Sequence, residues 1–189
     1  MSQSMGMPKA YVSWSSGKDS AFALQVARLS KLAEIVGVLV TVNVVHERVA
    51  MHGVRDALLD RQIAALGLPA IKVPLPSPCS NEIYEERMEE ACATMKAQGV
   101  SQVIFGDLFL EDIRAYREEK LRAAGMTPIF PLWGRDTGAL AQEMIAEGLL
   151  PYITCLDPRR LDRRFAGRRF DESLLSDVAR QKVGLNTLQ

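Results

Sequence analysis

The sequence has little cysteine, few aromatic residues and no net charge, and its cysteine content and charge balance each argue against a class of protein. Its three cysteines, Cys79, Cys92 and Cys155, lie far apart without a CxxC pair, which argues against a disulfide framework and a structural zinc site. Aromatic residues make up 6% of the 189 residues, and 23 basic residues balance 23 acidic ones. With this balance, no overall field attracts nucleic acid or an anionic membrane.

Long apolar runs are also missing. No stretch approaches the ~20 apolar residues that span a bilayer, and the N-terminus lacks the charged start and apolar core of a signal peptide. We therefore expect a cytoplasmic protein with no membrane partner. The composition that is present, 48% hydrophobic and 24% charged residues, is that of a globular chain able to bury one sizeable core.

Apolar runs alternate with helical patterns over the first 130 residues. Continuous runs predict buried strands, and apolar residues every third or fourth position predict the helices between them. The expected strands cover residues 11–14, 35–45, 70–75, 103–105 and 127–130. This alternation is typical of an α/β fold, with a parallel five-stranded sheet that carries helices on both faces.

The pattern changes after residue 130. A helix is expected over residues 139–147 and a short strand over residues 152–156. We therefore expect a nucleotide-binding domain over residues 1–130 and a small C-terminal α/β subdomain, which binds substrate, over residues 131–189.

Residues 15–20, Ser-Ser-Gly-Lys-Asp-Ser, lie between the first expected strand and a helix. They do not form a Walker A loop, because Asp19 stands where its Ser or Thr belongs and Val12 where its first glycine belongs. Free backbone N–H groups at such a helix start still suit an anion, and Gly17 permits close approach. Lys18 either contacts phosphate or faces solvent. Asp19 either caps the helix or holds a metal that bridges phosphates.

This order of residues resembles the SGGxDS signature of the PP-loop (N-type) ATP pyrophosphatases, with Ser16 in place of the usual first glycine. The resemblance implies a HUP-type, Rossmann-like sheet that binds ATP with Mg²⁺. It also implies cleavage between the α and β phosphates, which gives an adenylated intermediate and pyrophosphate. The loop residues that it assigns to nucleotide binding are Ser15, Ser16, Gly17, Lys18, Asp19 and Ser20.

Three further segments make the resemblance more specific. They are Val103-Ile104-Phe105-Gly106-Asp107, Pro131-Leu132-Trp133 and the helical pattern from Leu140 to Gly148. With the loop, they resemble the diphthine–ammonia ligase group, also called the ATP-binding domain 4 family, over about residues 10–170.

The helix after Gly106 matches that group only in part. Arg114 and Glu118 fall where the group has Arg and Glu, whereas Ile113 and Tyr116 replace a Gln and an Arg. The chain thus resembles the bacterial relatives, whose substrate the family name does not give. We expect a catalytic role for Arg114 on a substrate carboxylate, the alternative being a surface ion pair with Glu118.

Further site residues are expected at the carboxyl ends of the strands, where such sheets bind ligands. Gly106 would let a ligand lie against the fourth strand, and Asp107 would act in catalysis and hold Mg²⁺ together with Asp19. The alternative for this pair is a plain strand-to-helix turn. His52 would hydrogen-bond the nucleotide, unless it is a loop histidine without a role. The backbone at Val42 would approach the adenine or the ribose.

The one basic patch lies in residues 158–170. Its arginines are Arg159, Arg160, Arg163, Arg164, Arg168 and Arg169. They suit a clamp for pyrophosphate or an anionic substrate, and a solvated or subunit-interface loop is the alternative.

These observations predict an AMP-forming ligase that adenylates a carboxylate, on a small molecule or a protein side chain, for amidation by ammonia. Nucleic acid is not an expected partner, and a homo-oligomer is compatible with the sequence. The alternatives are a PP-loop enzyme of tRNA or nucleobase modification, and a non-catalytic regulatory protein that binds adenine nucleotides.

Overall fold

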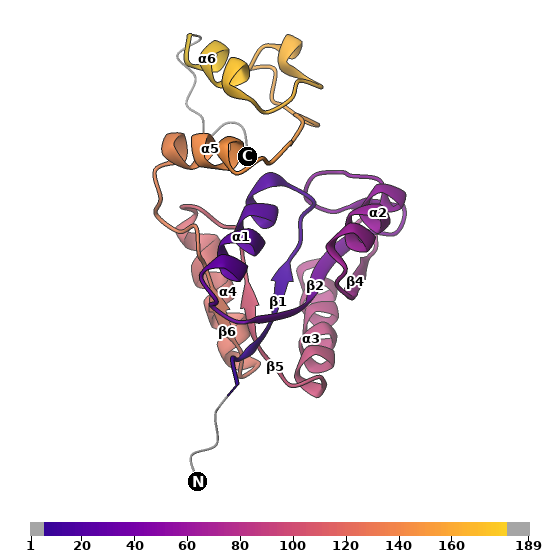
Figure 1. The fold of residues 1–189 in the computed structure, drawn as a ribbon. Helices are drawn as coiled ribbons and strands as arrows, with labels where there is room; N and C mark the ends of the chain where they lie inside the picture. Colours follow the sequence, from indigo (N-terminus) through magenta and orange to yellow (C-terminus); the bar gives the residue numbers. More distant parts are fainter. Residues whose placement is uncertain (1–5, 181–189) are drawn as a thin grey trace.

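Apolar runs form the strands of a six-stranded sheet in the computed structural model, which describes residues 6–180 (Figure 1). The strands are β1 Lys9–Ser13, β2 Glu34–Asn43, β3 Arg48–Val49, β4 Ala70–Leu75, β5 Val100–Ile104 and β6 Thr127–Ile129. The helices are α1 Lys18–Leu29, α2 Asp56–Leu66, α3 Asn81–Ala97, α4 Glu111–Ala123, α5 Thr137–Ala146, the 3₁₀ turn η1 Arg163–Phe165 and α6 Glu172–Arg180. The expected α/β architecture, consistent with a Rossmann-like HUP fold, is confirmed. Within the described residues, no helix is long and apolar enough to cross a membrane.

Five of the strands run parallel, in the order β4-β2-β1-β5-β6. The chain starts at the centre with β1, extends the sheet to one side with β2 and β4, and then to the other side with β5 and β6. The carboxyl ends of β1 and β5 therefore meet where the strand order reverses, which is the place where such sheets bind ligands.

The sixth strand, β3, was not expected from the sequence. It pairs antiparallel with the end of β2, where Val42 lies opposite Val49. Because β4 occupies one edge of this part of β2, β3 takes the other edge, beyond Leu39, the last residue of β2 that pairs with β1. Residues 44–55 consequently fold back over the carboxyl end of β1.

Alternation along the strands divides the core between the two faces of the sheet. On β1, Ala10 and Val12 pack with α1, which contributes the buried Phe22, and with α2 and α5. Tyr11 points to the opposite face, where Met95 of α3 and residues of α4 cover the sheet. Helices thus cover each face of the sheet, and the carboxyl ends of the parallel strands remain at one edge.

Helix α5 joins this core to a third apolar cluster. In Figure 1, α5 lies between α1 and the C-terminal segment that ends with α6. Its Leu140 and Met144 pack with the residues of α1 and α2, whereas Ala141 packs with Phe165 and Leu174 of the C-terminal segment. The same helix therefore serves two apolar clusters. The division into residues 1–130 and 131–189 remains a prediction.

The strand expected over residues 152–156 is wrong. Only Tyr152 forms a β-bridge, with Arg169. Tyr152 follows Pro151 and its side chain is 60% exposed, so the segment lacks the half-buried surface that stabilises a strand. Residues 181–189 of the expected subdomain lie outside the described residues.

Candidate functional site

Residues 15–20 join β1 to α1 in a tight polar turn. The hydroxyl of Ser20 lies at its centre, where it donates to the carbonyl of Gly17 at 3.0 Å and accepts the backbone N–H of Ser15 at 3.3 Å. The Ser15 hydroxyl donates to the same Ser20 oxygen at 3.1 Å and accepts the N–H of Gly17 at 3.3 Å. Two of the predicted ligand hydroxyls therefore fix the shape of the turn.

Ser16 is the strained position of the turn. Its φ of 64° lies in the left-handed region, which costs a residue other than glycine about 1–2 kcal/mol. Its hydroxyl oxygen is buried without a hydrogen-bond partner. The substitution of serine for the usual glycine thus places an unsatisfied hydroxyl inside the turn, where a bound acceptor would satisfy it.

Lys18 and Asp19 begin α1 and pair with each other. The Lys18 Nζ lies 2.9 Å from Oδ1 and 2.8 Å from Oδ2 of Asp19. The two side chains are only 13% and 19% exposed, so Lys18 does not face solvent. Asp19 does not cap the helix, because the N-cap is Gly17 and no described side chain accepts a backbone N–H of the first turn. The first N–H groups of α1 therefore remain available to an anion.

The end of β5 packs directly on this turn. A Cβ atom at Gly106 would lie 2.6 Å from the backbone carbon of Asp19 and 2.8 Å from the nitrogen of Ser20. Only glycine permits this approach. Gly106 therefore brings the end of β5 against the turn, and its observed neighbour is the backbone of Asp19 and Ser20.

Asp107 follows at the same place and is half-buried. The Arg117 Nε lies 3.0 Å from its Oδ2 but is too poorly aligned to donate, so this buried oxygen accepts no hydrogen bond. Burial raises the pKa of Asp107, the charge of Arg117 lowers it, and the charge of Asp19 raises it. Because the neighbouring Gly106 packs on the backbone of Asp19, Asp107 lies on the side of the turn that carries Asp19.

His52 reaches the turn from the folded-back residues 44–55. A Cβ atom at Gly17 would lie 2.4 Å from the His52 Nε2, so the imidazole covers this glycine. Burial lowers the pKa of His52, while Asp19 raises it and Lys18 lowers it. The turn thus faces an imidazole that is neutral at pH 7.

A family model described as the diphthamide synthase N-terminal domain matches residues 8–128. The chain belongs to this family. The diphthamide synthase family is part of the PP-loop ATP pyrophosphatase superfamily, whose members use ATP, typically with Mg²⁺. The matched range contains the turn of residues 15–20, His52 and Asp107. No curated protein matches the chain.

The side chains at the turn can hold Mg²⁺ only together with a nucleotide. Within residues 6–180, no group of three or more His, Cys, Asp or Glu side chains could hold a metal ion. Asp19 and Asp107 offer two carboxylates, and Mg²⁺ usually binds through one or two carboxylates together with phosphate oxygens and water. A cation between them would also relieve their repulsion. The residues present therefore fit Mg²⁺–ATP, the form of nucleotide typical of the superfamily.

Val42 and Arg114, two of the predicted site residues, make contacts within the protein in this member of the diphthamide synthase family. The Val42 side chain is buried in the core, and its backbone lies between β3 and β4. Arg114 pairs with Glu118 at 2.7 Å, and its guanidinium lies 5.0 Å from the ring centre of Phe130 and 4.6 Å from that of Trp133. Arg114 is thus held by its own helix and by aromatic neighbours.

The sequence reasoning missed Arg117. Its guanidinium stacks 4.2 Å from the ring centre of Phe105 and forms the ion pair with Asp107. Arg114 and Arg117 are three residues apart and therefore lie on one side of α4. The signal in the sequence that could have identified Arg117 was its spacing of three residues from Arg114, on the helix that follows Gly106-Asp107.

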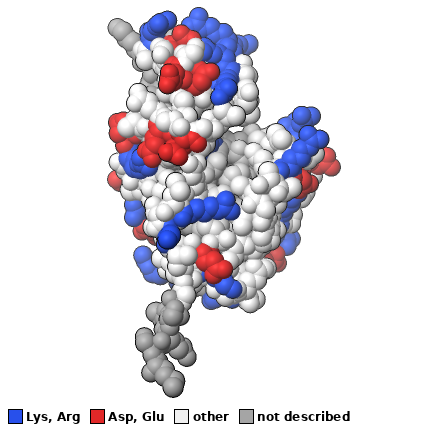
Figure 2. Space-filling model, in the orientation of Figure 1, with Lys and Arg blue, Asp and Glu red and all other residues white. Residues whose placement is uncertain are grey.

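The predicted basic patch lies on the C-terminal segment, where acidic side chains are interspersed with it (Figure 2). Three ion pairs neutralise part of its charge, namely Arg159–Asp157, Arg164–Asp162 and Arg168–Asp177. Phe170, at the end of the patch, places its ring centre 5.8 Å from the Lys18 Nζ. The C-terminal segment therefore reaches the turn through an aromatic side chain.

Proposed function

We propose that the protein is an AMP- and pyrophosphate-forming amide ligase, which adenylates a substrate carboxylate for amidation by ammonia, as diphthine–ammonia ligases do. The observation that carries this proposal is a pair of unsatisfied buried atoms beside the start of α1. Among the described residues, three buried side-chain atoms lack a hydrogen-bond partner, and Ser16 Oγ and Asp107 Oδ2 are two of them. Buried polar atoms seldom lack a hydrogen bond, and Asp107 Oδ2 has only its ion pair with Arg117. A phosphate would accept a hydrogen bond from Ser16, and its Mg²⁺ would bind Asp107.

Each side chain at the turn has a role in this proposal. The N–H groups of the first turn of α1 and the Ser16 hydroxyl would hold the β and γ phosphates and stabilise the charge on the departing pyrophosphate. Asp19 and Asp107 would hold Mg²⁺, which neutralises phosphate charge when it is bound. Arg117 would orient Asp107, and the imidazole of His52 would form a hydrogen bond with a phosphate oxygen.

The reaction needs no nucleophilic side chain. An oxygen of the substrate carboxylate attacks the α-phosphorus, and the bond from this phosphorus to the bridging oxygen breaks as pyrophosphate leaves. Ammonia then attacks the acyl carbon, loses a proton and expels AMP. Residues 131–189 would provide the substrate-binding side, which the contact of Phe170 with Lys18 supports.

The test is the identity of the products. The protein is incubated with ATP, Mg²⁺, ammonium and a panel of carboxylic acids, and AMP, ADP and pyrophosphate are measured. We expect equal amounts of AMP and pyrophosphate, and loss of both in Asp107→Asn but not in the control Asp112→Asn, an exposed acid in the first turn of α4. ADP as the product would contradict attack at the α-phosphate. Nucleotide binding without turnover would favour a regulatory protein.

A further inference from the structure

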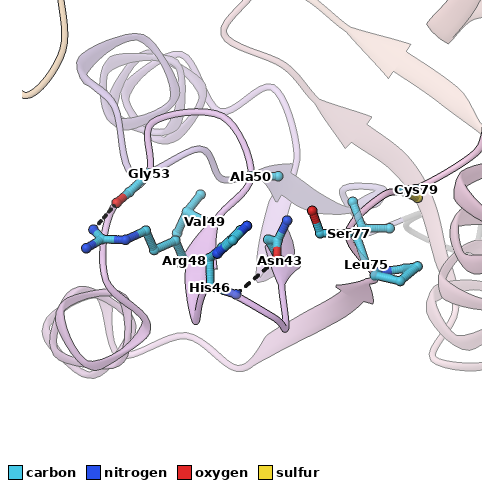
Figure 3. Close-up of a pocket in the computed structure, with 10 residues that line it drawn as sticks. Asn43, His46, Arg48, Val49, Ala50, Gly53, Leu75, Ser77 and Cys79 are labelled. Carbon is cyan, nitrogen blue, oxygen red and sulfur yellow. Dashed lines mark hydrogen bonds between the residues drawn. The ribbon is translucent and has the colours of Figure 1, made fainter.

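A cavity of about 450 Å³ at the carboxyl ends of β2 and β4 adjoins the proposed nucleotide site (Figure 3). It is lined by Val49, which pairs with Val42, and by Gly53, the neighbour of His52. The cavity thus lies where the adenine or the ribose is expected, next to the turn of residues 15–20. A nucleotide held there would occupy the edge of the sheet from β2 to β1. The part of this edge over β5 and β6 is left for the acceptor of the proposed reaction.

The start of α4 carries an exposed apolar patch at this remaining part of the edge. Leu110 is the N-cap of α4, and Ile113 and Tyr116 follow at intervals of three residues, so they are neighbours on the surface of the helix. The side chains of the patch are between 38% and 49% exposed. Scattered exposed apolar residues are ordinary, whereas a contiguous group marks a binding surface. The members of this α4 patch are Phe109, Leu110, Ile113 and Tyr116.

Arg117 connects the α4 patch to Asp107. It lies four residues after Ile113 and therefore one turn further along the same side of the helix. Its Nε lies 3.0 Å from the Asp107 Oδ2, and its guanidinium stacks on Phe105 at the end of β5. The patch thus continues from the carboxylate that we assign to Mg²⁺, without another element between them.

The charges around the α4 patch disfavour an acceptor with a second negative group. The three cations on these turns of α4, Arg114, Arg117 and Lys120, each have an acidic partner. Glu111 and Asp112 add negative charge in the first turn of the helix, where both are exposed. A second carboxylate bound there would be repelled, whereas an uncharged apolar group would cover the patch.

The α4 patch is confined to the end of the helix that lies at the site. Further along α4, the exposed side chains include Glu119, Lys120 and Arg122, which are charged. An interface between subunits commonly buries about 800 Å² on each partner, which would extend well beyond one end of a helix. The apolar part of a small ligand needs only a few such side chains. The extent of the patch therefore favours a ligand over a second copy of the chain.

We propose that the α4 patch binds the apolar body of the acceptor, so that the adenylated substrate is a monocarboxylic acid with an aliphatic or aromatic group. The proposal rests on the proposed function, because it names the substrate class of that reaction. The carboxylate of the acid lies toward Asp107 and the α-phosphate, and its apolar group lies along Ile113 and Tyr116. These two residues determine specificity and take no part in the chemical steps.

Stable analogues of the acyl-adenylate test this proposal without turnover. In acylsulfamoyl adenosines, a sulfamoyl group stands in for the phosphate of the acyl-adenylate. Calorimetry compares the acetyl, butanoyl and hexanoyl analogues with a succinyl analogue, which carries a second carboxylate. A fully buried methylene strengthens binding about fourfold, so we expect the hexanoyl analogue to bind at least about tenfold more tightly than the acetyl one. The succinyl analogue should show no such gain. Equal affinity for the acetyl and hexanoyl analogues would overturn the proposal.

Ile113→Gln and Tyr116→Ser are the variants that place this binding on α4. Both side chains are exposed, so these substitutions leave the core intact. We expect the advantage of the hexanoyl analogue over the acetyl one to fall to about threefold or less in each variant. The control is Leu29→Gln, an apolar side chain that is 71% exposed at the far end of α1. An undiminished advantage in both variants, or an equal fall in Leu29→Gln, would contradict the proposal.

Product analysis with the free acids keeps the two proposals apart. If AMP and pyrophosphate form as readily with acetate as with hexanoate, the proposed function stands and the assignment of the α4 patch fails. If the analogues bind more tightly as the acyl chain lengthens but ATP yields ADP, the apolar site stands and the proposed reaction fails. Sedimentation tests the remaining alternative, because a dimer that Ile113→Gln dissociates would make the patch a subunit interface and overturn the proposal.

Discussion

Gly106→Ala tests whether the close packing of β5 on the turn of residues 15–20 is essential. The new Cβ would lie 2.6 Å and 2.7 Å from the backbone carbon and oxygen of Asp19, and 2.8 Å from the nitrogen of Ser20. Ordinary contacts begin near 3.4 Å, so β5 and the turn must separate by about 0.8 Å. Because all three atoms belong to the backbone, no side-chain rotation relieves the overlap.

The expected effect is on both stability and binding. Overpacking of this kind costs about 1–3 kcal/mol of folding free energy. One of the displaced atoms, the Ser20 nitrogen, carries an N–H of the first turn of α1, which we assign to phosphate. A shift near 1 Å in a reacting site lowers rates by roughly 100-fold. We therefore expect Gly106→Ala to bind Mg²⁺–ATP at least about tenfold more weakly and to lose most of its AMP formation.

Denaturation in urea and calorimetry with Mg²⁺–ATP measure these two effects. The control is Gly99→Ala, at a φ of +76° with nothing within 4 Å of the new Cβ. It loses about 1–2 kcal/mol through backbone strain, yet should bind the nucleotide normally. Unchanged nucleotide affinity in Gly106→Ala would refute the reasoning, since the packing of β5 would then not position the binding groups.

Three further substitutions probe the same site. Ser16→Gly removes left-handed strain of about 1–2 kcal/mol against a glycine entropy cost of about 0.5–1 kcal/mol, so urea denaturation should show a net gain of up to about 1.5 kcal/mol. Asp107→Asn should leave the unliganded protein at least as stable, because burial disfavours the carboxylate, while calorimetry shows weaker Mg²⁺-dependent ATP binding. The folded pKa of His52 lies below its unfolded value, so the native state binds fewer protons between the two and loses stability as pH falls through this window. Denaturation at a series of pH values should show this loss, up to about 1.4 kcal/mol per pH unit, reduced in His52→Gln.

The parallel sheet was predictable because most of its strands and helices are long enough to show a clear pattern of apolar residues. Buried parallel strands such as β2 read as continuous apolar runs, and a helical pattern separates each from the next parallel strand. The two-residue strand β3 has no such signal, since it forms only where the end of β2 offers a free edge. Conversely, the apolar residues 152–156 look like a strand but find one bridging partner, Arg169.

The sequence also predicted that the site residues which follow neighbouring parallel strands lie close together. The turn of residues 15–20 and Gly106-Asp107 both follow parallel strands, and neighbouring parallel strands end at the same edge. Contacts set by side-chain direction were not predictable from the chain order. Arg117, rather than Arg114, lies beside Asp107 because the register of α4 on β5 decides which arginine points to the strand end.

The pairing of Lys18 with Asp19 explains why metal and nucleotide would bind together in the proposed reaction. Both side chains are largely buried, and a buried charge that loses its only partner is strongly destabilising. Mg²⁺ alone would take Asp19 and leave Lys18 without its carboxylate, whereas a phosphate alone would take Lys18 and leave Asp19 facing Asp107. Mg²⁺–ATP supplies both new partners at once, the metal for the carboxylates and a phosphate for the ammonium. Because of this ion pair, the turn would bind the complete Mg²⁺–ATP complex in preference to the metal alone or the nucleotide alone.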